Sequence, residues 1–217
     1  MKSQNNESAI ALDYFNRFHP DMPKTVLSIG ENDGVTFSNS YDLIEAGWHG
    51  VLLEPSDKAF AKLSELYKDN DRVMCFHTGI AAITGKFKFK ESGSYENGSD
   101  VALYSTLVPS ETERWKGKVE FEDTEAMFMD WQYFNSHYSD ELPKTFDYIT
   151  IDAEGYDLII LEQINLAAFG CKLLCIEHNG NADLIAKYTA YAEHFGLKEF
   201  SINAENIIFG DFLNLRT

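Results

Sequence analysis

The sequence predicts an α/β fold in which a single domain, residues 1–217, is built on a mostly parallel sheet. Apolar runs typical of buried strands alternate with amphipathic stretches typical of helices. The first run, Thr25–Ile29, leads into a glycine-containing turn, a helix and a second apolar run, which together indicate a βαβ unit with parallel strands. The last two runs, Leu197–Ile202 and Asn206–Gly210, lie too close together for a crossover, so they predict an antiparallel terminal pair.

The first third of the chain predicts a leading helix and three strands. Within residues 1–24, Ile10, Leu12 and Phe15 recur near helical spacing, and Pro20 and Pro23 close this segment before the first strand. The expected elements are a helix at Ser8–Arg17, a strand at Thr25–Ile29, a helix from Thr36 or Ser38 to Ala46, a strand at Gly50–Leu53, a helix at Asp57–Tyr67 and a strand at Arg72–Phe76.

Residues 85–143 interrupt the α/β alternation and predict a small β insertion on the substrate side. Lys and Phe alternate over Lys86–Lys90, as expected for a strand with one buried face. The other elements expected here are a loop at Ser92–Ser99, strands at Val101–Leu107 and Val119–Glu122, and a helix at Thr124–Phe134. The alternation then resumes with a strand at Phe146–Ile151, a helix at Tyr156–Leu166, a strand at Lys172–Glu177 and a helix at Ala182–Phe195.

Composition and charge restrict the partners. The formal net charge is −17, which disfavours nucleic acid and anionic membrane surfaces, because both are bound through clustered Lys and Arg. No apolar run approaches the roughly 20 residues that cross a bilayer, and the N-terminus does not resemble a signal peptide. Cys75, Cys171 and Cys175 all lie in apolar runs and fit buried free thiols. We therefore expect a cytoplasmic protein that acts on a small molecule or glycan, with a homo-oligomer left open.

The turn after the first strand predicts a nucleoside site. The interval from Gly30 to Glu54 is close to the roughly 20 positions between such a turn and the acid that bonds a ribose. The third glycine of G-x-G-x-x-G is missing, and Glu31 and Asp33 would repel a pyrophosphate. S-adenosylmethionine (SAM) carries a ribose, an ammonium and a sulfonium but no phosphate, so it fits better than NAD. Asp33 or Glu31 either faces the ammonium or holds the turn through backbone amides.

The ends of the fourth and fifth predicted parallel strands supply candidate catalytic residues, namely Asp152, Glu177 and His178. Ligands of open α/β sheets bind beyond the carboxyl ends of the strands. His178 could accept the proton of a hydroxyl that attacks a sulfonium methyl group. Alternatively, Asp152 and Glu177, with Asn179 or His178, could hold a divalent cation that lowers the pKa of the hydroxyl. His178 could also simply orient Asp152 or Glu154.

Six segments together resemble the FkbM family of SAM-dependent methyltransferases: residues 28–39 (SIGENDGVTFSN), 47–55 (GWHGVLLEP), 79–82 (GIAA), 105–107 (STL), 146–155 (FDYITIDAEG) and 176–179 (IEHN). The resemblance implies a Rossmann-like class I methyltransferase fold with a seven-stranded sheet. It also implies that SAM lies over the first two strand ends and that a hydroxyl of a sugar or another small molecule is methylated.

From the residues and the resemblance together, we predict a candidate site without a resident metal, with a divalent cation as the alternative. Glu54 is expected to hold the ribose, the turn the methionine end, residues 78–81 the adenine, and His178 with Asp152 the acceptor hydroxyl. The predicted SAM-binding residues are Gly30, Glu31, Asn32, Asp33, Thr36, Glu54, Pro55, Ser56, Thr78, Gly79, Ile80, Ala81 and Asp152. The alternatives are a catalytically silent SAM-binding module and an NAD-dependent oxidoreductase.

Overall fold

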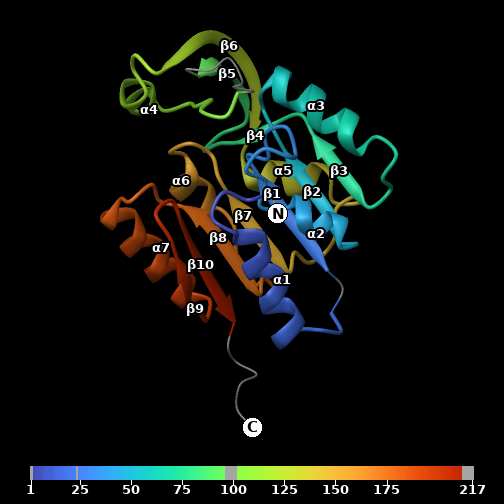
Figure 1. The fold of residues 1–217 in the computed structure, drawn as a ribbon. Helices are drawn as coiled ribbons and strands as arrows, with labels where there is room; N and C mark the ends of the chain where they lie inside the picture. The colour runs from blue at the N-terminus through green and yellow to red at the C-terminus, as the bar shows by residue number, and fades with distance from the viewer. Residues whose placement is uncertain (1, 23, 96–101, 212–217) are drawn as a thin grey trace.

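The computed structural model describes residues 2–22, 24–95 and 102–211 and contains two sheets (Figure 1). The larger sheet has seven strands in the order β3-β2-β1-β7-β8-β10-β9, and β10 is antiparallel to both of its neighbours. This arrangement confirms the predicted mostly parallel sheet with an antiparallel terminal strand. The strands are β1 (Thr25–Ile29), β2 (His49–Leu53), β3 (Val73–Phe76), β7 (Tyr148–Ile151), β8 (Leu173–Glu177), β9 (Leu197–Ile202) and β10 (Asn206–Asp211).

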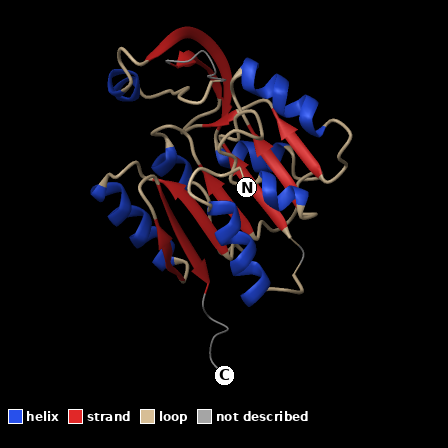
Figure 2. Ribbon diagram, viewed as in Figure 1, coloured by secondary structure: helices blue, strands red, loops and turns tan. Residues whose placement is uncertain are grey.

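Helices cover both faces of the large sheet (Figure 2). Alternate residues of β1 point to opposite faces, with Val26 in one apolar cluster and Leu27 in the other, as the two-residue period of a strand requires. One face is covered by α1 (Glu7–Phe18), α2 (Tyr41–Glu45) and α3 (Asp57–Tyr67), and the other by α5 (Trp131–His137), α6 (Asp157–Leu161) and α7 (Ala182–His194). No helix in the described part of the chain is both long and apolar enough to span a bilayer.

The insertion forms a separate three-stranded sheet of β4 (Gly79–Ile80), β6 (Val119–Met129) and β5 (Gly85–Tyr95), with α4 (Pro109–Arg114) beside it. The prediction of a short strand at Val119–Glu122 followed by a helix at Thr124–Phe134 was wrong in its boundaries. The strand continues as far as Met129, because β6 pairs antiparallel with β5 along nearly its whole length. The Asp130 side chain accepts a hydrogen bond from the Tyr133 amide and so caps α5, which begins at Trp131.

Three other predicted boundaries also need correction. Residues 102–107 form turns in place of a strand, and only Thr106 makes a bridge, to Lys90; residues 96–101 lie outside the described part. The helix expected over Tyr156–Leu166 ends at Leu161, because the amides of Gln163 and Ile164 bond to carbonyls three residues back, in tight turns. The helix after β1 begins only at Tyr41, because residues 38–40 are bound to a buried carboxylate of the preceding turn.

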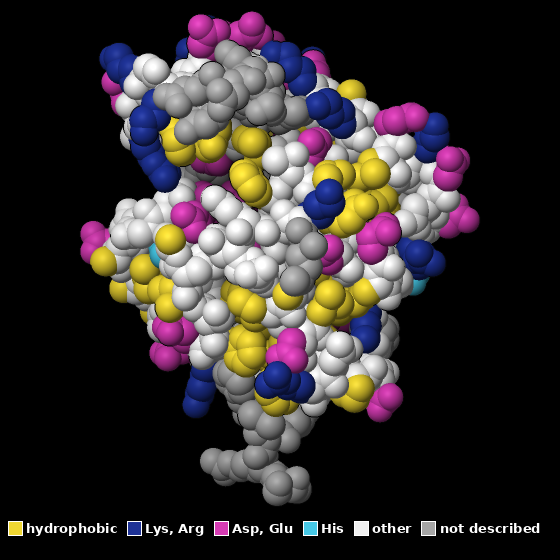
Figure 3. Space-filling model, in the orientation of Figure 1, with side chains coloured by type: hydrophobic (Ala, Val, Ile, Leu, Met, Phe, Trp, Pro, Cys, Tyr) yellow, Lys and Arg dark blue, Asp and Glu magenta, His cyan; other side chains and the backbone are white. Residues whose placement is uncertain are grey.

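The charged side chains on the surface are consistent with the net charge of −17. On the face seen in Figure 3, Lys and Arg side chains lie singly or in small groups beside Asp and Glu. Exposed ion pairs on the protein surface include Lys90 with Asp123 at 2.7 Å and Lys116 with Glu113 at 3.0 Å. Exposed pairs of this kind contribute little to stability.

Helix α1 is attached to the far edge of the sheet through buried polar groups. The hydroxyl of Tyr14 lies 2.9 Å from the carbonyl oxygen of Lys172 and accepts a hydrogen bond of 2.8 Å from the Asp211 amide. The buried carboxylate of Glu7 accepts hydrogen bonds from the side chains of Asn203, at 2.8 Å, and Asn206, at 3.0 Å. These contacts connect the first helix to the last hairpin of the sheet.

Replacing Tyr14 by Phe is expected to lower the free energy of unfolding by about 1–2 kcal/mol, because it removes the hydrogen bonds that the fully buried Tyr14 makes to backbone groups of Lys172 and Asp211. Urea denaturation followed by circular dichroism measures this loss. Tyr133→Phe is the matched control, since the Tyr133 side chain is 43% exposed and should tolerate loss of its hydroxyl. Equal stability of Y14F and Y133F would contradict this account of how α1 is attached.

Candidate functional site

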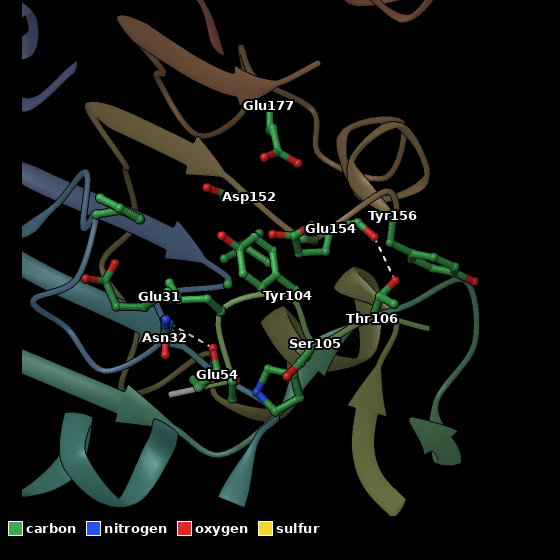
Figure 4. A pocket seen from close by; sticks show the side chains of 18 of the residues that line it. Glu31, Asn32, Glu54, Tyr104, Ser105, Thr106, Asp152, Glu154, Tyr156 and Glu177 are labelled. Carbon is green, nitrogen blue, oxygen red and sulfur yellow. Dashed lines mark hydrogen bonds between the residues drawn. The ribbon is translucent and has the colours of Figure 1, made fainter. Parts of the chain in front are cut away.

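A cavity of about 210 Å³ lies at the carboxyl ends of β1, β2, β7 and β8 (Figure 4). The strand ends supply its base, and the insertion supplies a wall through residues 102–107 and Trp115. The insertion is joined to the base by the Thr106 hydroxyl, which donates a hydrogen bond of 2.7 Å to the backbone carbonyl of Glu154. The predicted location of the site, beyond the ends of the parallel strands, is therefore where the structure has its cavity.

Glu54, at the end of β2, joins two loops that border this cavity. Its carboxylate accepts one hydrogen bond from the Asn32 amide at 2.8 Å and another from the Ser56 amide at 2.7 Å. Burial raises the pKa of Glu54 to about 7, and these two amide donors oppose that shift. Each carboxylate oxygen can accept more than one hydrogen bond, so Glu54 can also accept donors from a ligand.

The turn after β1 brings the chain close to β7. Gly30 has a φ of +84°, and a Cβ atom there would lie 1.8 Å from the carbonyl oxygen of Asp152. The next residue, Glu31, is buried and accepts hydrogen bonds from the hydroxyls of Ser38 at 2.6 Å and Ser40 at 2.9 Å. Burial raises the pKa of Glu31. At position 30, only glycine permits the close approach between the end of β1 and the end of β7.

Asp33 holds the turn and does not line the cavity. Its carboxylate accepts hydrogen bonds from the amides of Val35, at 2.9 Å, and Thr36, at 2.7 Å, and from the Thr36 hydroxyl. Asp33 was expected either to face the ammonium of SAM or to hold the turn through backbone amides, and the structure supports the second role. Glu31, in contrast, does line the cavity.

Two asparagines place unpaired polar atoms at the cavity. Among the residues that the structure describes, neither polar atom of the Asn32 side chain has a hydrogen-bond partner, and the same is true of Oδ1 of Asn39, although both side chains are buried. Both residues line the cavity. Buried polar groups are costly without partners, so these atoms are suited to hydrogen bonds with a polar ligand.

Three carboxylates, of Asp152, Glu154 and Glu177, converge at the ends of β7 and β8 (Figure 4). One oxygen atom from each lies within 4.8 Å of those from the other two. Burial, followed by repulsion from Asp157, raises the pKa of Asp152 to about 7. Burial and the neighbouring acids also raise the pKa values of Glu154 and Glu177. The loop that carries Asp152 and Glu154 is held by Asp157, which accepts hydrogen bonds from the amides of Ala153 and Gly155.

His178 lies outside this cavity, in a neighbouring one of about 220 Å³ that Glu177 also lines. Its side chain is 3% exposed, and its Nδ1 atom accepts a hydrogen bond of 2.9 Å from the Gly180 amide. The neutral ring therefore carries its proton on Nε2, which has no partner. The structure does not bring His178 and Asp152 to the same cavity, and it supports a donor where the sequence suggested a proton acceptor.

The structure brings most of the predicted SAM-binding residues to the cavity at the strand ends. Those that line it are Gly30, Glu31, Asn32, Thr36, Glu54, Pro55, Gly79, Ile80 and Asp152, together with the predicted catalytic residue Glu177. The others do not line it. Ser56 caps α3, and the buried Thr78 and Ala81 lie beside the small sheet. Phe37, Asn39 and Glu154 line the cavity but were not predicted, and of these only Glu154, directly after a strand, has a recognisable signal.

Comparisons with known proteins give a family and several similar solved structures. A family model described as the methyltransferase FkbM domain matches residues 28–199. Similar solved structures include an O-methyltransferase from Bacillus cereus in complex with SAH, at 12% identity and a TM-score of 0.47, covering 96% of this chain and 82% of that one. Another is the fibrillarin pre-rRNA processing protein of Methanococcus jannaschii, at 10% identity and a TM-score of 0.49. This match covers 95% of this chain and 76% of that one. No curated protein matches the sequence.

Proposed function

Because this chain belongs to the FkbM methyltransferase family, we propose that it transfers a methyl group from SAM to a hydroxyl oxygen of a sugar, a glycan or another small hydroxylated metabolite. Its sheet is that of the Rossmann-like class I methyltransferase fold. The observation that carries the proposal is that Glu54 and the carboxylates of Asp152, Glu154 and Glu177 line one cavity. One end of that cavity suits the ribose of SAM and the other an acceptor hydroxyl.

Glu54 holds the ribose in this proposal. Two neighbouring hydroxyls of the sugar would donate to the two carboxylate oxygens, which already accept the amides of Asn32 and Ser56. The unpaired side-chain atoms of Asn32 and Asn39 are suited to the amino and carboxyl groups of the methionine part. Gly79 and Ile80, which line the same cavity beside Glu54, support the adenine. The anionic surroundings favour the positive sulfonium.

The acceptor hydroxyl lies at the carboxylates of Asp152, Glu154 and Glu177 in this proposal. The hydroxyl oxygen attacks the methyl carbon while one of these carboxylates accepts the hydroxyl proton. The bond between the methyl carbon and sulfur breaks, and the neutral thioether leaves. Catalysis then depends mainly on alignment of oxygen, methyl group and sulfur. The net charge of −17 supports a small acceptor, because a nucleic acid would be repelled.

The test of this function uses SAM with a labelled methyl group and a panel of deoxysugars, glycans and small alcohols. We expect label in at least one hydroxylated acceptor and saturable binding of SAM in a separate titration. NAD, titrated in parallel, should not bind. Binding of NAD alone would reject the proposal, while binding of SAM without transfer to any acceptor would indicate a silent SAM-binding module.

Trp115 and Tyr104 are proposed to form the wall that contacts the acceptor. Their rings lie 4.2 Å apart between centroids, and both residues line the cavity. Trp115→Ala is expected to raise the KM for the acceptor about tenfold, since such an aromatic contact contributes about 1 kcal/mol beyond its buried area. The Kd for SAM should not change. Tyr133→Ala, an exposed aromatic outside the cavity, is the control, and a loss of SAM affinity in W115A would contradict this division of the site.

A further inference from the structure

We propose that Asp152, Glu154 and Glu177 form a binding site for one divalent cation of the Mg²⁺ or Mn²⁺ class. This inference goes beyond the proposed function, which does not require a metal. The three residues come from the ends of two adjacent parallel strands, β7 and β8, and their side chains point toward a common space in Figure 4. Carboxylate oxygens are the ligands that such hard cations accept.

The separation of the carboxylate oxygens fits ligands of a single ion. One oxygen of each residue lies within 4.8 Å of the other two. Oxygens on opposite sides of an ion with bonds of about 2.0–2.1 Å are about 4.0–4.2 Å apart, and oxygens on adjacent sides are closer. The three carboxylates can therefore approach one ion with small side-chain movements. Two or three protein ligands leave positions for water and for an acceptor oxygen.

Within the described residues these charges have no salt-bridge partner, and Arg114 only partly offsets the rise in the pKa values of Glu154 and Glu177. Of the ion pairs among residues 2–22, 24–95 and 102–211, none includes Asp152, Glu154 or Glu177. Arg114 borders both cavities, but its guanidinium is paired with Glu111 at 3.1 Å. Buried charges in proteins are paired or coordinate metals. An ion with two positive charges would supply the missing partner.

Two side chains give a further indication of a ligand at this place. Glu177 is 9% exposed, and within the described residues its carboxylate accepts no hydrogen bond. His178, 3% exposed, has an unpartnered Nε2 in the adjoining cavity, which Glu177 also lines. With Nδ1 occupied by the Gly180 amide, Nε2 donates. It therefore needs an oxygen acceptor in that cavity, which a water molecule bound to the cation would provide.

The cation would also deepen the proposed transfer, and this consequence alone rests on the proposed function. An acceptor hydroxyl that binds a divalent ion loses its proton more readily than one in water. The ion would thus fix the acceptor oxygen beside the SAM pocket.

The experiment titrates the metal-free protein with MnCl₂ alone and follows free Mn²⁺ by electron paramagnetic resonance. Wild type is expected to bind one Mn²⁺ per chain, and excess MgCl₂ should displace it. Glu177→Gln should weaken the binding at least tenfold. Glu113→Gln is the matched control, since Glu113 lies on exposed α4 and pairs with Lys116, and it should bind Mn²⁺ as wild type does. Absence of saturable binding by wild type, or equal binding by E177Q, overturns the proposal.

Two further measurements separate this result from misfolding and from failure of the proposed function. The Tm of metal-free E177Q should equal or exceed that of wild type, because an amide removes repulsion within the carboxylate cluster. Glu154→Gln is the second variant, because the Glu154 side chain is less buried than that of Glu177. E154Q should also bind Mn²⁺ at least tenfold more weakly than wild type. If E177Q does not fold and E154Q binds Mn²⁺ as tightly as wild type, the site is rejected. Since SAM and acceptor are absent, a failed transfer assay would not affect this test.

Discussion

Replacing Glu54 by Ala is expected to weaken the binding of SAM about 100-fold, as measured by isothermal titration calorimetry. The estimate takes about 3 kcal/mol for hydrogen bonds between a charged carboxylate and a ribose diol. The substitution also removes the acceptor of the Asn32 and Ser56 amides, which position the two loops at the cavity. Both effects act on the same end of the cavity, so the loss should appear in the Kd for SAM.

Two companion variants identify the cause of that loss. Glu54→Gln keeps one carbonyl acceptor but places an amide group against a backbone donor, so its affinity should lie between those of wild type and E54A. Glu45→Ala, at the exposed end of α2, should bind SAM as wild type does. If E54A retained full affinity while E45A was folded and active, Glu54 could not be the ribose ligand.

Replacing Gly30 by Ala is expected to destabilise the protein by at least about 4 kcal/mol and to abolish SAM binding. The new Cβ atom would lie 1.8 Å from the carbonyl oxygen of Asp152, so the end of β1 would have to move away from the end of β7. Those two strands are paired at the centre of the large sheet, through Ile29 and Ile151 among others. Urea denaturation and the yield of soluble protein measure the effect.

Gly196→Ala is the control that separates two effects of G30A: the collision of the new Cβ atom with Asp152, and the cost of a left-handed backbone conformation. Gly196 has a φ of +83°, nearly that of Gly30, but no atom lies within 4 Å of the position of its added Cβ. A left-handed conformation alone costs an L residue about 1–2 kcal/mol, which is the loss expected for G196A. A G30A protein no less stable than G196A would show that the close approach of Gly30 to Asp152 is unimportant.

The large sheet was predictable because its strands are short apolar runs with clear punctuation. Both faces of β1 and β7 are covered, so these strands appear as continuous apolar sequences, and the short connection between β9 and β10 allows only antiparallel pairing. The insertion was less predictable. Phe128, Trp131 and Phe134 have helical spacing, but Phe128 belongs to a strand paired with β5, and a long-range pairing of this kind leaves little local signal.

Positions at the site were most clearly predictable where a residue directly follows a strand. Glu54 and Asp152 were found in this way, and both line the cavity. Asn39 was missed because it reaches the cavity through an irregular segment, which residues 38 and 40 fix by bonding to Glu31. His178 also follows a strand, but the direction of its side chain depends on the turn at Gly180, and sequence spacing does not reveal it.

The insertion begins and ends at neighbouring points of the fold. Gly85, at the start of β5, and Ile80, in β4, lie beside Phe128 and Met129, at the end of β6. A segment with adjacent ends can be lengthened, shortened or exchanged while the registers of the strands that carry it stay the same. Descendants of such a chain could therefore acquire new targets by remodelling this hairpin, while the strands of the large sheet are inherited intact.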